Sequence, residues 1–219
     1  MDYLLNIWDI ILHLDSYLES LIDSTGILVY IIMAFVVFAE TAFVVTVFLP
    51  SDTILFAATA LAAVNNSLSF PLLFIIFIIS AALGDSVNFM IGRKLRHKIE
   101  KKDKVLFIKK ENLQKADSYY QKNGTMTLIV ARFIPVLRSF APFIAGMSDR
   151  KYISFFKANI IGVIIWNIIF CSLGYFFGNL PFVQEYYSFI VVAIGCLSLF
   201  TALLSVIAKK IFSKSKSEQ

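Results

Sequence analysis

Long apolar runs separated by short polar stretches dominate this sequence. The apolar runs cover residues 27–49, 70–92, 125–148, 152–178 and 186–208. A helix needs about 20 apolar residues to cross a hydrocarbon core of about 30 Å. The pattern therefore predicts an all-α polytopic membrane protein, with its membrane domain over 25–208, rather than a water-soluble domain.

Residues 1–24 follow a different pattern. Polar residues recur every three or four positions from Asp2 to Asp23, and Leu4 and Trp8 lie on another face. This spacing predicts an amphipathic helix that lies in the membrane interface. The segment lacks a basic start and a small-residue cleavage site, so we expect no cleavable signal peptide.

Two of the apolar segments are interrupted by proline. Pro50 is followed by Ser51, Asp52 and Thr53, which suit the start of a new helix, and the arm 53–64 would span only about 18 Å. Pro135 interrupts the stretch 125–148 in the same way. Broken helices occur at membrane depth only where protein or water lines the break. We therefore predict two re-entrant helical hairpins, 27–64 and 125–148, beside three full spans.

Basic residues are confined to a few segments and indicate the orientation. None precedes Arg93, eleven fall in 93–123, and four lie in the tail 209–219. Lys and Arg gather in cytoplasmic loops, so the segment 93–123 and the tail are predicted to be cytoplasmic. The net charge of +5 is clustered beside the spans and does not indicate a nucleic-acid partner. The hairpins then enter from opposite sides, an arrangement typical of inverted-repeat transporters.

Ionisable residues lie close to both predicted breaks. Glu40, Asp52, Arg132 and Arg138 would each cost about 2.5–3.5 kcal/mol in a membrane segment, so they are expected to pair or to have a function. Two acids and two bases give a neutral site if the hairpin tips meet. Two plainer interpretations stay open: salt bridges that only join the hairpins, and shallow hairpin ends with the charges in water.

The role of Asp85 is open at this stage. It is either a third buried acid or a residue near the cytoplasmic end of its span. Helices starting near Asp52 and near Ser139 would direct their positive ends into the site. Two arginines beside such helix starts form a receptor for an anion such as a phosphate.

Other chemistry has little support in the sequence. No GxSxG or HExxH motif occurs, and His13 and His97 are isolated. An aspartyl enzyme using Asp52 and Asp85 lacks a supporting motif, and a scaffold would not need four buried charges. Cys171 and Cys196 are interpreted as packing residues. We expect no enzymatic activity, no metal and no cofactor.

A family resemblance rests on these same residues. Its elements are Glu40, Leu49–Asp52, Gly84–Asp85, Ile91–Arg93, Ala131–Pro135, Arg138, Ala145–Gly146, Phe156, Trp166, Gly174–Tyr175 and Gly178. In this order they make the chain resemble the DedA family of the VTT (SNARE-associated Golgi protein) superfamily over about residues 25–180. The segment Arg-Phe-Ile-Pro followed by a second Arg is its most specific part.

The resemblance implies two facing hairpins, a role in membrane homeostasis, and proton-dependent transport or translocation of undecaprenyl phosphate. We therefore expect a flippase for a phospholipid or polyprenyl phosphate in a bacterial inner membrane. Arg132 and Arg138 would bind the phosphate, while Glu40, Asp52 and Asp85 would balance charge or take protons. The alternative is a proton-coupled transporter of small ions or cationic drugs. Whether the chain forms a homo-oligomer stays open.

Overall fold

The computed structural model describes most of the predicted membrane domain. It covers residues 26–46, 51–64, 68–102 and 104–180, the last range with gaps at 106–107, 110–112, 115, 119, 121–123, 125 and 179. The predicted amphipathic helix 1–24, the break residue Pro50, the span 186–208 and the basic tail 209–219 lie outside the described residues.

Two long helices run side by side through the molecule. They are α5 (Phe70–Lys102, 33 residues) and α9 (Tyr152–Phe177, 26 residues), and both are long and apolar enough to cross a membrane. At 1.5 Å per residue their lengths are about 50 and 39 Å. Helix α5 continues past residue 92, the predicted end of the first span, so the start of the basic segment 93–123 belongs to the same helix as far as Lys102. The added turns consist of helix-forming residues and contain an Arg96–Glu100 ion pair at 2.8 Å.

The first predicted hairpin consists of two short helices. Helix α3 (Leu28–Ala42) is followed by the 3-10 turn η1 (Val44–Thr46) and by α4 (Ser51–Val64). The predicted first arm, 27–49, was too long, because α3 ends at Ala42. There the Ala39 carbonyl accepts hydrogen bonds from the Phe43 N–H at 3.2 Å and from the Thr46 hydroxyl at 2.6 Å. Arms of 15 and 14 residues measure about 22 and 21 Å, so neither crosses a bilayer alone.

The second predicted hairpin has one very short arm. Helix α7 (Met126–Ala131) leads into a bend at 132–134, and α8 (Pro135–Met147) follows. The chain therefore breaks immediately before Pro135, which begins α8. Proline suits that position because its ring fixes a helical φ angle and its missing N–H would have no partner there. Pro142 lies inside α8.

The basic segment 93–123 contains a feature that an all-helical prediction omits. Strands β1 (Lys104–Val105) and β2 (Ile108–Lys109) form a short antiparallel pair. The pairing extends the end of α5 and does not contribute to the core of the membrane domain.

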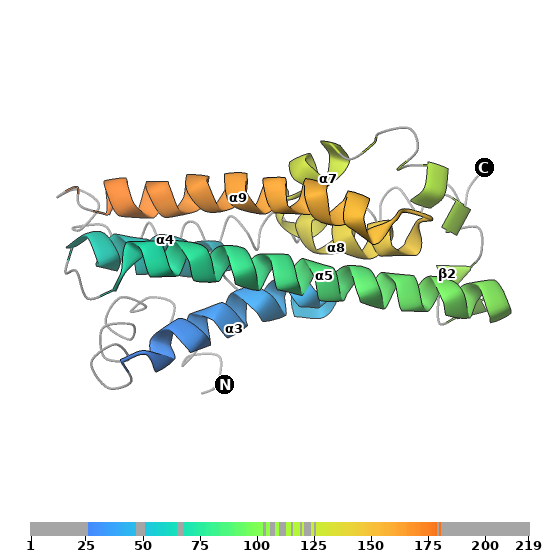
Figure 1. Ribbon diagram of the computed structural model, residues 1–219, viewed down its shortest axis with the longest axis horizontal. Helices are drawn as coiled ribbons and strands as arrows, with labels where there is room; N and C mark the ends of the chain where they lie inside the picture. The colour runs from blue at the N-terminus through green and yellow to red at the C-terminus, as the bar shows by residue number, and fades with distance from the viewer. Residues whose placement is uncertain are drawn as a thin grey trace, which may run out of the picture.

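Helices α3 and α8 approach each other from opposite ends of the molecule and meet midway along the long helices (Figure 1). Helix α8 contacts both α3 and η1 at this meeting point. The first arm of each hairpin packs on the long helix that follows it, α3 on α5 and α7 on α9. The second arms exchange partners, with α4 on α9 and α8 on α5. Two repeats of opposite orientation are expected to pack in this way.

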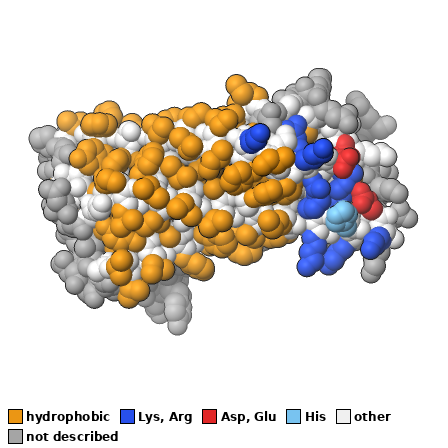
Figure 2. Space-filling model, in the orientation of Figure 1, with side chains coloured by type: hydrophobic (Ala, Val, Ile, Leu, Met, Phe, Trp, Pro, Cys, Tyr) orange, Lys and Arg blue, Asp and Glu red, His pale blue; other side chains and the backbone are white. Residues whose placement is uncertain are grey.

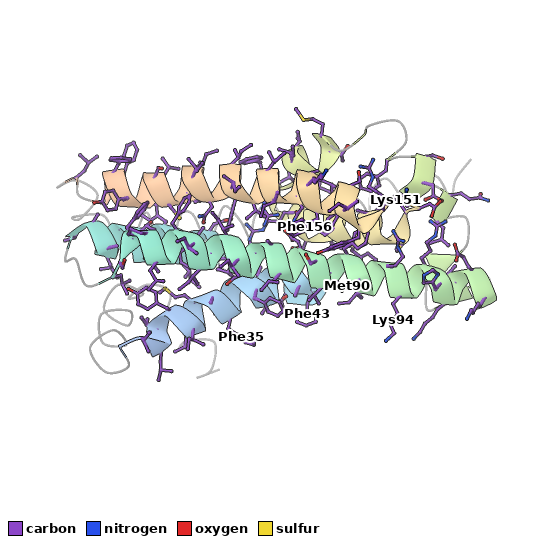
Figure 3. The ribbon with its side chains drawn as sticks, viewed as in Figure 1. Phe35, Phe43, Met90, Lys94, Lys151 and Phe156 are labelled. Carbon is purple, nitrogen blue, oxygen red and sulfur yellow. The ribbon has the colours of Figure 1, made fainter. Side chains whose placement is uncertain are left out.

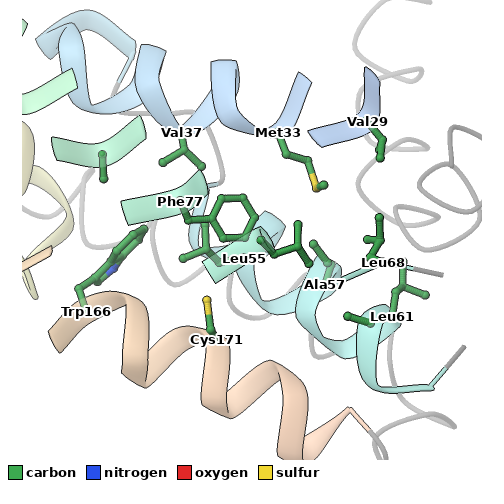
Figure 4. Packing of buried hydrophobic residues seen from close by; sticks show 14 of the residues in the cluster. Val29, Met33, Val37, Leu55, Ala57, Leu61, Leu68, Phe77, Trp166 and Cys171 are labelled. Atoms are coloured by element: carbon green, nitrogen blue, oxygen red, sulfur yellow. The ribbon is translucent and has the colours of Figure 1, made fainter. Parts of the chain in front are cut away.

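The four helices α3, α4, α5 and α9 enclose the main apolar core (Figure 4). Its largest members include Leu55, Phe77 and Trp166, which are at most 2% exposed. Cys171 is fully buried in this core, as expected of a packing residue. Trp166 lies at the end of the core that is nearest the hairpin tips.

Glycines allow the closest helix crossings, and α5 against α8 is the clearest case. A Cβ atom at Gly146 would lie 2.0 Å from the Phe89 carbonyl oxygen, and one at Gly92 would lie 2.2 Å from the Phe143 carbonyl oxygen. Both distances are far below van der Waals contact, so a side chain at either position must push the two backbones apart.

We therefore expect Gly146→Ala to lower the unfolding free energy by about 1–3 kcal/mol, the usual cost of overpacking. Gly162→Ala is the matched control, because its Cβ would meet nothing closer than 3.4 Å. Alanine also favours helix over glycine, so the control should not lose stability. Melting temperatures in detergent test the difference, and equal values for the two variants would contradict it.

The surface is divided between an apolar belt and one basic end (Figure 2). Phe35, Phe43 and Met90 point outward from the helices and are 46–65% exposed (Figure 3). Lys94 and Lys151 lie at the basic end of the molecule, beyond the apolar belt. Apolar side chains exposed over this length suit contact with lipid, and the basic end suits the cytoplasmic face.

Cysteine labelling tests this orientation. In a background with Cys171→Ser and Cys196→Ser, we expect Ser69→Cys to react with an impermeant maleimide added outside intact cells. Lys101→Cys should react only after permeabilisation. Both positions are exposed and lie near opposite ends of α5. The reverse labelling pattern would place the basic end outside.

The basic end of α5 is more structured than a solvated loop. Arg93 Nε donates to the Gly146 carbonyl at 3.2 Å, and Arg96 Nη1 donates to the Met147 carbonyl at 2.8 Å. These contacts satisfy carbonyls at the end of α8, where cations are also favoured by the helix dipole. Arg96 also binds Asp117 at 3.0 Å. Some of the basic residues therefore fasten α8 in addition to indicating topology.

Candidate functional site

All five ionisable residues singled out from the sequence are buried. Glu40 lies in the last turn of α3, Asp52 in the first turn of α4, Asp85 in α5, Arg132 in the bend after α7, and Arg138 near the start of α8. Their exposed fractions are at most 8%. This burial argues against the interpretation in which shallow hairpin ends leave the charges in water.

Arg138 connects the two hairpins. Its Nη1 donates to Asp52 Oδ1 at 2.7 Å, and its Nη2 donates to Ser51 Oγ at 3.0 Å and forms an ion pair with Glu40. The backbone N–H of Ser51 donates in turn to Glu40 Oε2 at 3.1 Å. One guanidinium of the second hairpin thus holds both arms of the first.

Arg132 forms a second cluster with Asp85. Its Nη1 donates to Asp85 Oδ2 at 2.5 Å and to Asn159 Oδ1 at 3.2 Å. Asp85 is 1% exposed and so is a third buried acid, which settles the question left open by the sequence. The centre contains three carboxyl groups and two guanidinium groups rather than two of each. If every group is ionised, the described part of the centre carries one net negative charge.

Trp166 lies beside both clusters. Its ring centroid is 5.5 Å from Cζ of Arg132 and 5.7 Å from Cζ of Arg138, within the range of cation–π contact. Its Nε1 donates to Asp52 Oδ1 at 3.1 Å. A single α9 side chain therefore links the first hairpin to both arginines.

Asn88 fastens the hairpin tips to α5. Its Nδ2 donates to the Thr41 carbonyl at 3.0 Å and to the Ser139 carbonyl at 2.7 Å. Thr41 belongs to the end of α3, and Ser139 belongs to α8.

The prediction of a helix start near Ser139 was wrong, because α8 begins four residues earlier, at Pro135. The predicted start near Asp52 is confirmed, since α4 begins at Ser51.

Within the part of the chain that the structure describes, buried polar atoms without a hydrogen-bond partner gather at the same centre. The donors include Nε of Arg132 and of Arg138 and the hydroxyl groups of Thr53 and Ser139, and the acceptors include Oδ1 of Asp85 and of Asn88. Buried polar groups in native proteins are usually paired, so such a group of unpaired donors and acceptors is unusual. The centre retains hydrogen-bonding capacity that a ligand or water can use.

Three neighbours were not assigned a role from the sequence: Asn88, Asn159 and Trp166. A signal for them exists in the spacing. Asn88 follows Asp85 by three residues, and Trp166 follows Asn159 by seven, so each pair shares one face of its helix. Where an apolar helix carries a buried acid, a second polar residue on the same face is a candidate member of the same buried site.

The comparisons with known proteins cover this centre. The VTT domain matches residues 49–176, more than half of the chain and a range that includes Asp52, Asp85, Arg132 and Arg138. Protein DedA of Escherichia coli (strain K12) is 38% identical over 211 residues, which is 96% of both chains. This chain belongs to the DedA family. It is therefore a membrane protein, as the apolar pattern predicted.

Other relatives of this DedA-family protein match it with lower identity or over less of the chain. The inner membrane protein YqjA of Escherichia coli (strain K12) is 26% identical over 179 residues, 82% of this chain and 80% of the relative. An alkaline phosphatase-like protein of Lactococcus lactis subsp. cremoris is 33% identical over 149 residues, 64% of this chain and 70% of the relative. No solved structure matches the chain.

Proposed function

We propose that this DedA-family protein translocates a lipid phosphate across the inner membrane of a bacterium, with undecaprenyl phosphate as the expected substrate. The observation that carries the proposal is the pair of buried arginines at the meeting point of two hairpins. Among the residues that the structure describes, the Nε donor of each arginine has no hydrogen-bond partner. Guanidinium groups bind phosphate oxygens in a planar, paired geometry that few other side chains match.

The acids explain how two arginines remain buried when no substrate is bound. A single unpaired charge in a membrane segment is costly, and each guanidinium here has at least one carboxylate partner. A phosphate would compete with those carboxylates for the same donors. The site therefore exchanges internal anions for an external one and never leaves an arginine unpaired.

The arrangement of the hairpins supports transport rather than binding alone. The centre is buried from both ends, and each hairpin contacts both long helices through its two arms. A shift of one hairpin relative to α5 and α9 would open the centre toward one face, and a shift of the other would open it toward the opposite face.

Transport of labelled undecaprenyl phosphate across liposomes that contain the purified protein tests the proposal. We expect movement that depends on the protein and is lost in the double variant Arg132→Ala/Arg138→Ala. A labelled polyprenol of equal chain length, which lacks the phosphate, is the control lipid. If the alcohol moves equally fast, or if only a soluble cation is transported, the phosphate proposal is wrong and the cation-transporter alternative is favoured.

Binding should strengthen as the pH falls. The centre already contains one more carboxyl than guanidinium, and a phosphate adds negative charge that protonation of an acid would relieve. By linkage, substrate that promotes proton uptake binds more tightly at lower pH. We expect Asp52→Asn or Glu40→Gln to retain binding with a flatter dependence between about pH 5.5 and 8. Binding by wild-type protein that is constant over this range would assign the acids a purely structural role.

A further inference from the structure

Two hydrogen-bond donors from different helices converge on one oxygen atom. Trp166 Nε1, from α9, and Arg138 Nη1, from α8, both donate to Asp52 Oδ1, at 3.1 and 2.7 Å. Trp166 is 2% exposed, so water does not compete for its N–H. The position of this oxygen is therefore defined by the protein around it and not by the Asp52 side chain alone.

The Trp166 ring adds a second function to the same residue. It lies within cation–π distance of both arginines, so it favours both guanidinium groups at this centre whichever anion they bind. A phenylalanine or leucine would fill much of the same space in the apolar core. Neither would supply the N–H, and leucine would not supply the aromatic face.

We propose that Trp166 is a phosphate-binding residue of this site. Its indole N–H and the Nη1–H of Arg138 form a receptor for one phosphate oxygen, a place that Asp52 Oδ1 fills when no substrate is bound. This inference rests on the proposed function. Substrate entry moves the Asp52 carboxyl aside and transfers both donors to the phosphate, while the ring keeps Arg132 and Arg138 in place.

Fluorescence gives a direct test, because the chain contains only two tryptophans, Trp8 and Trp166. In the Trp8→Phe variant all tryptophan emission comes from Trp166. We expect a polyprenyl phosphate to change this emission in a saturable manner in nanodiscs. A polyprenol of equal length should leave it unchanged. Inorganic phosphate is the third arm: an equal change at equal concentration would support the receptor but assign it to free phosphate and not to a lipid.

Binding of radiolabelled polyprenyl phosphate gives an independent measure. Trp166→Phe keeps a ring but loses a donor to a charged group, so its affinity should fall about tenfold. Trp166→Leu also loses the ring that keeps Arg132 and Arg138 in place for the phosphate, so its affinity should fall about 100-fold. Phe170→Leu is the matched control, because Phe170 contacts the Trp166 ring at a centroid distance of 5.6 Å but supplies no hydrogen-bond donor. Its affinity should be unchanged. All variants should elute like the wild-type protein, and Trp166→Leu, which removes the most volume from the core, should melt at the lowest temperature.

The outcomes separate this inference from the function on which it rests. If the wild-type protein does not bind the radiolabelled lipid, both are wrong. If it binds the lipid but Trp166 emission is constant and Trp166→Phe binds equally well, the phosphate site exists without Trp166. A saturable emission change together with weaker binding by Trp166→Phe supports the receptor.

Discussion

Replacing Arg138 with lysine is expected to abolish most transport while the protein still inserts and folds. Arg138 uses two nitrogens for two arms of one hairpin: Nη1 binds Asp52 on α4, and Nη2 binds Ser51 on α4 and pairs with Glu40 on α3. Lysine has a single nitrogen on a flexible stem and cannot reproduce this fork. The loss of one charge-assisted hydrogen bond corresponds to a decrease in the transport rate of about 10- to 100-fold.

The matched control is Arg132→Lys. From the sequence alone both lysine variants are expected to fail, but the structure separates them. Both hydrogen bonds of Arg132 in the described centre come from the single nitrogen Nη1, which a lysine ammonium can imitate in part. Its transport should fall by less than about tenfold. Liposome transport normalised to inserted protein measures both variants, and equal or greater loss for Arg132→Lys would show that the fork does not distinguish Arg138 from Arg132.

The largest effect on stability is expected from Arg132→Met. The substitution leaves Asp85, which is 1% exposed, as a buried acid without its cation. Removing one member of a buried ion pair costs about 3–5 kcal/mol, whereas replacing both with apolar residues is often neutral. The double variant Asp85→Leu/Arg132→Met should therefore regain the melting temperature of the wild-type protein.

This pair of variants also decides between structure and function. If Asp85 and Arg132 only join α5 to the second hairpin, the stable double variant should transport normally. If Arg132 binds the phosphate, the double variant should be stable and inactive. We expect the second result. Unfolding in detergent and transport in liposomes, measured on the same preparations, distinguish the two cases.

Several features of this protein follow from local sequence. Apolar runs of about 20 residues, proline positions and the one-sided distribution of Lys and Arg predicted the long helices, the two broken segments and the basic end. The cost of a charge in hydrocarbon predicted that Glu40, Asp52, Arg132 and Arg138 would pair or have a function, and the structure buries all four with partners. These properties depend on a few neighbouring residues, and for that reason a single sequence was sufficient.

The pairing of these charges could not be predicted in the same way. Arg138 and Asp52 are 86 residues apart, and Arg132 and Asp85 are 47 apart. The choice of acid for each arginine depends on how far the packed helices are shifted along their axes relative to one another. The close glycine contacts between α5 and α8 help to fix that shift. The end of α3 at Ala42 was missed because the chain contains no Gly or Pro between Ala42 and Pro50 that would signal a helix end.

The shared position of Trp166 was also decided by tertiary structure. Its sequence context is apolar and predicts only core packing, and Trp166 is a member of the apolar core in Figure 4. Its contacts with two arginines and an aspartate arise because α9 passes the meeting point of both hairpins. Periodicity determines which face of a helix is buried, but only the packing of distant segments determines which groups that face meets.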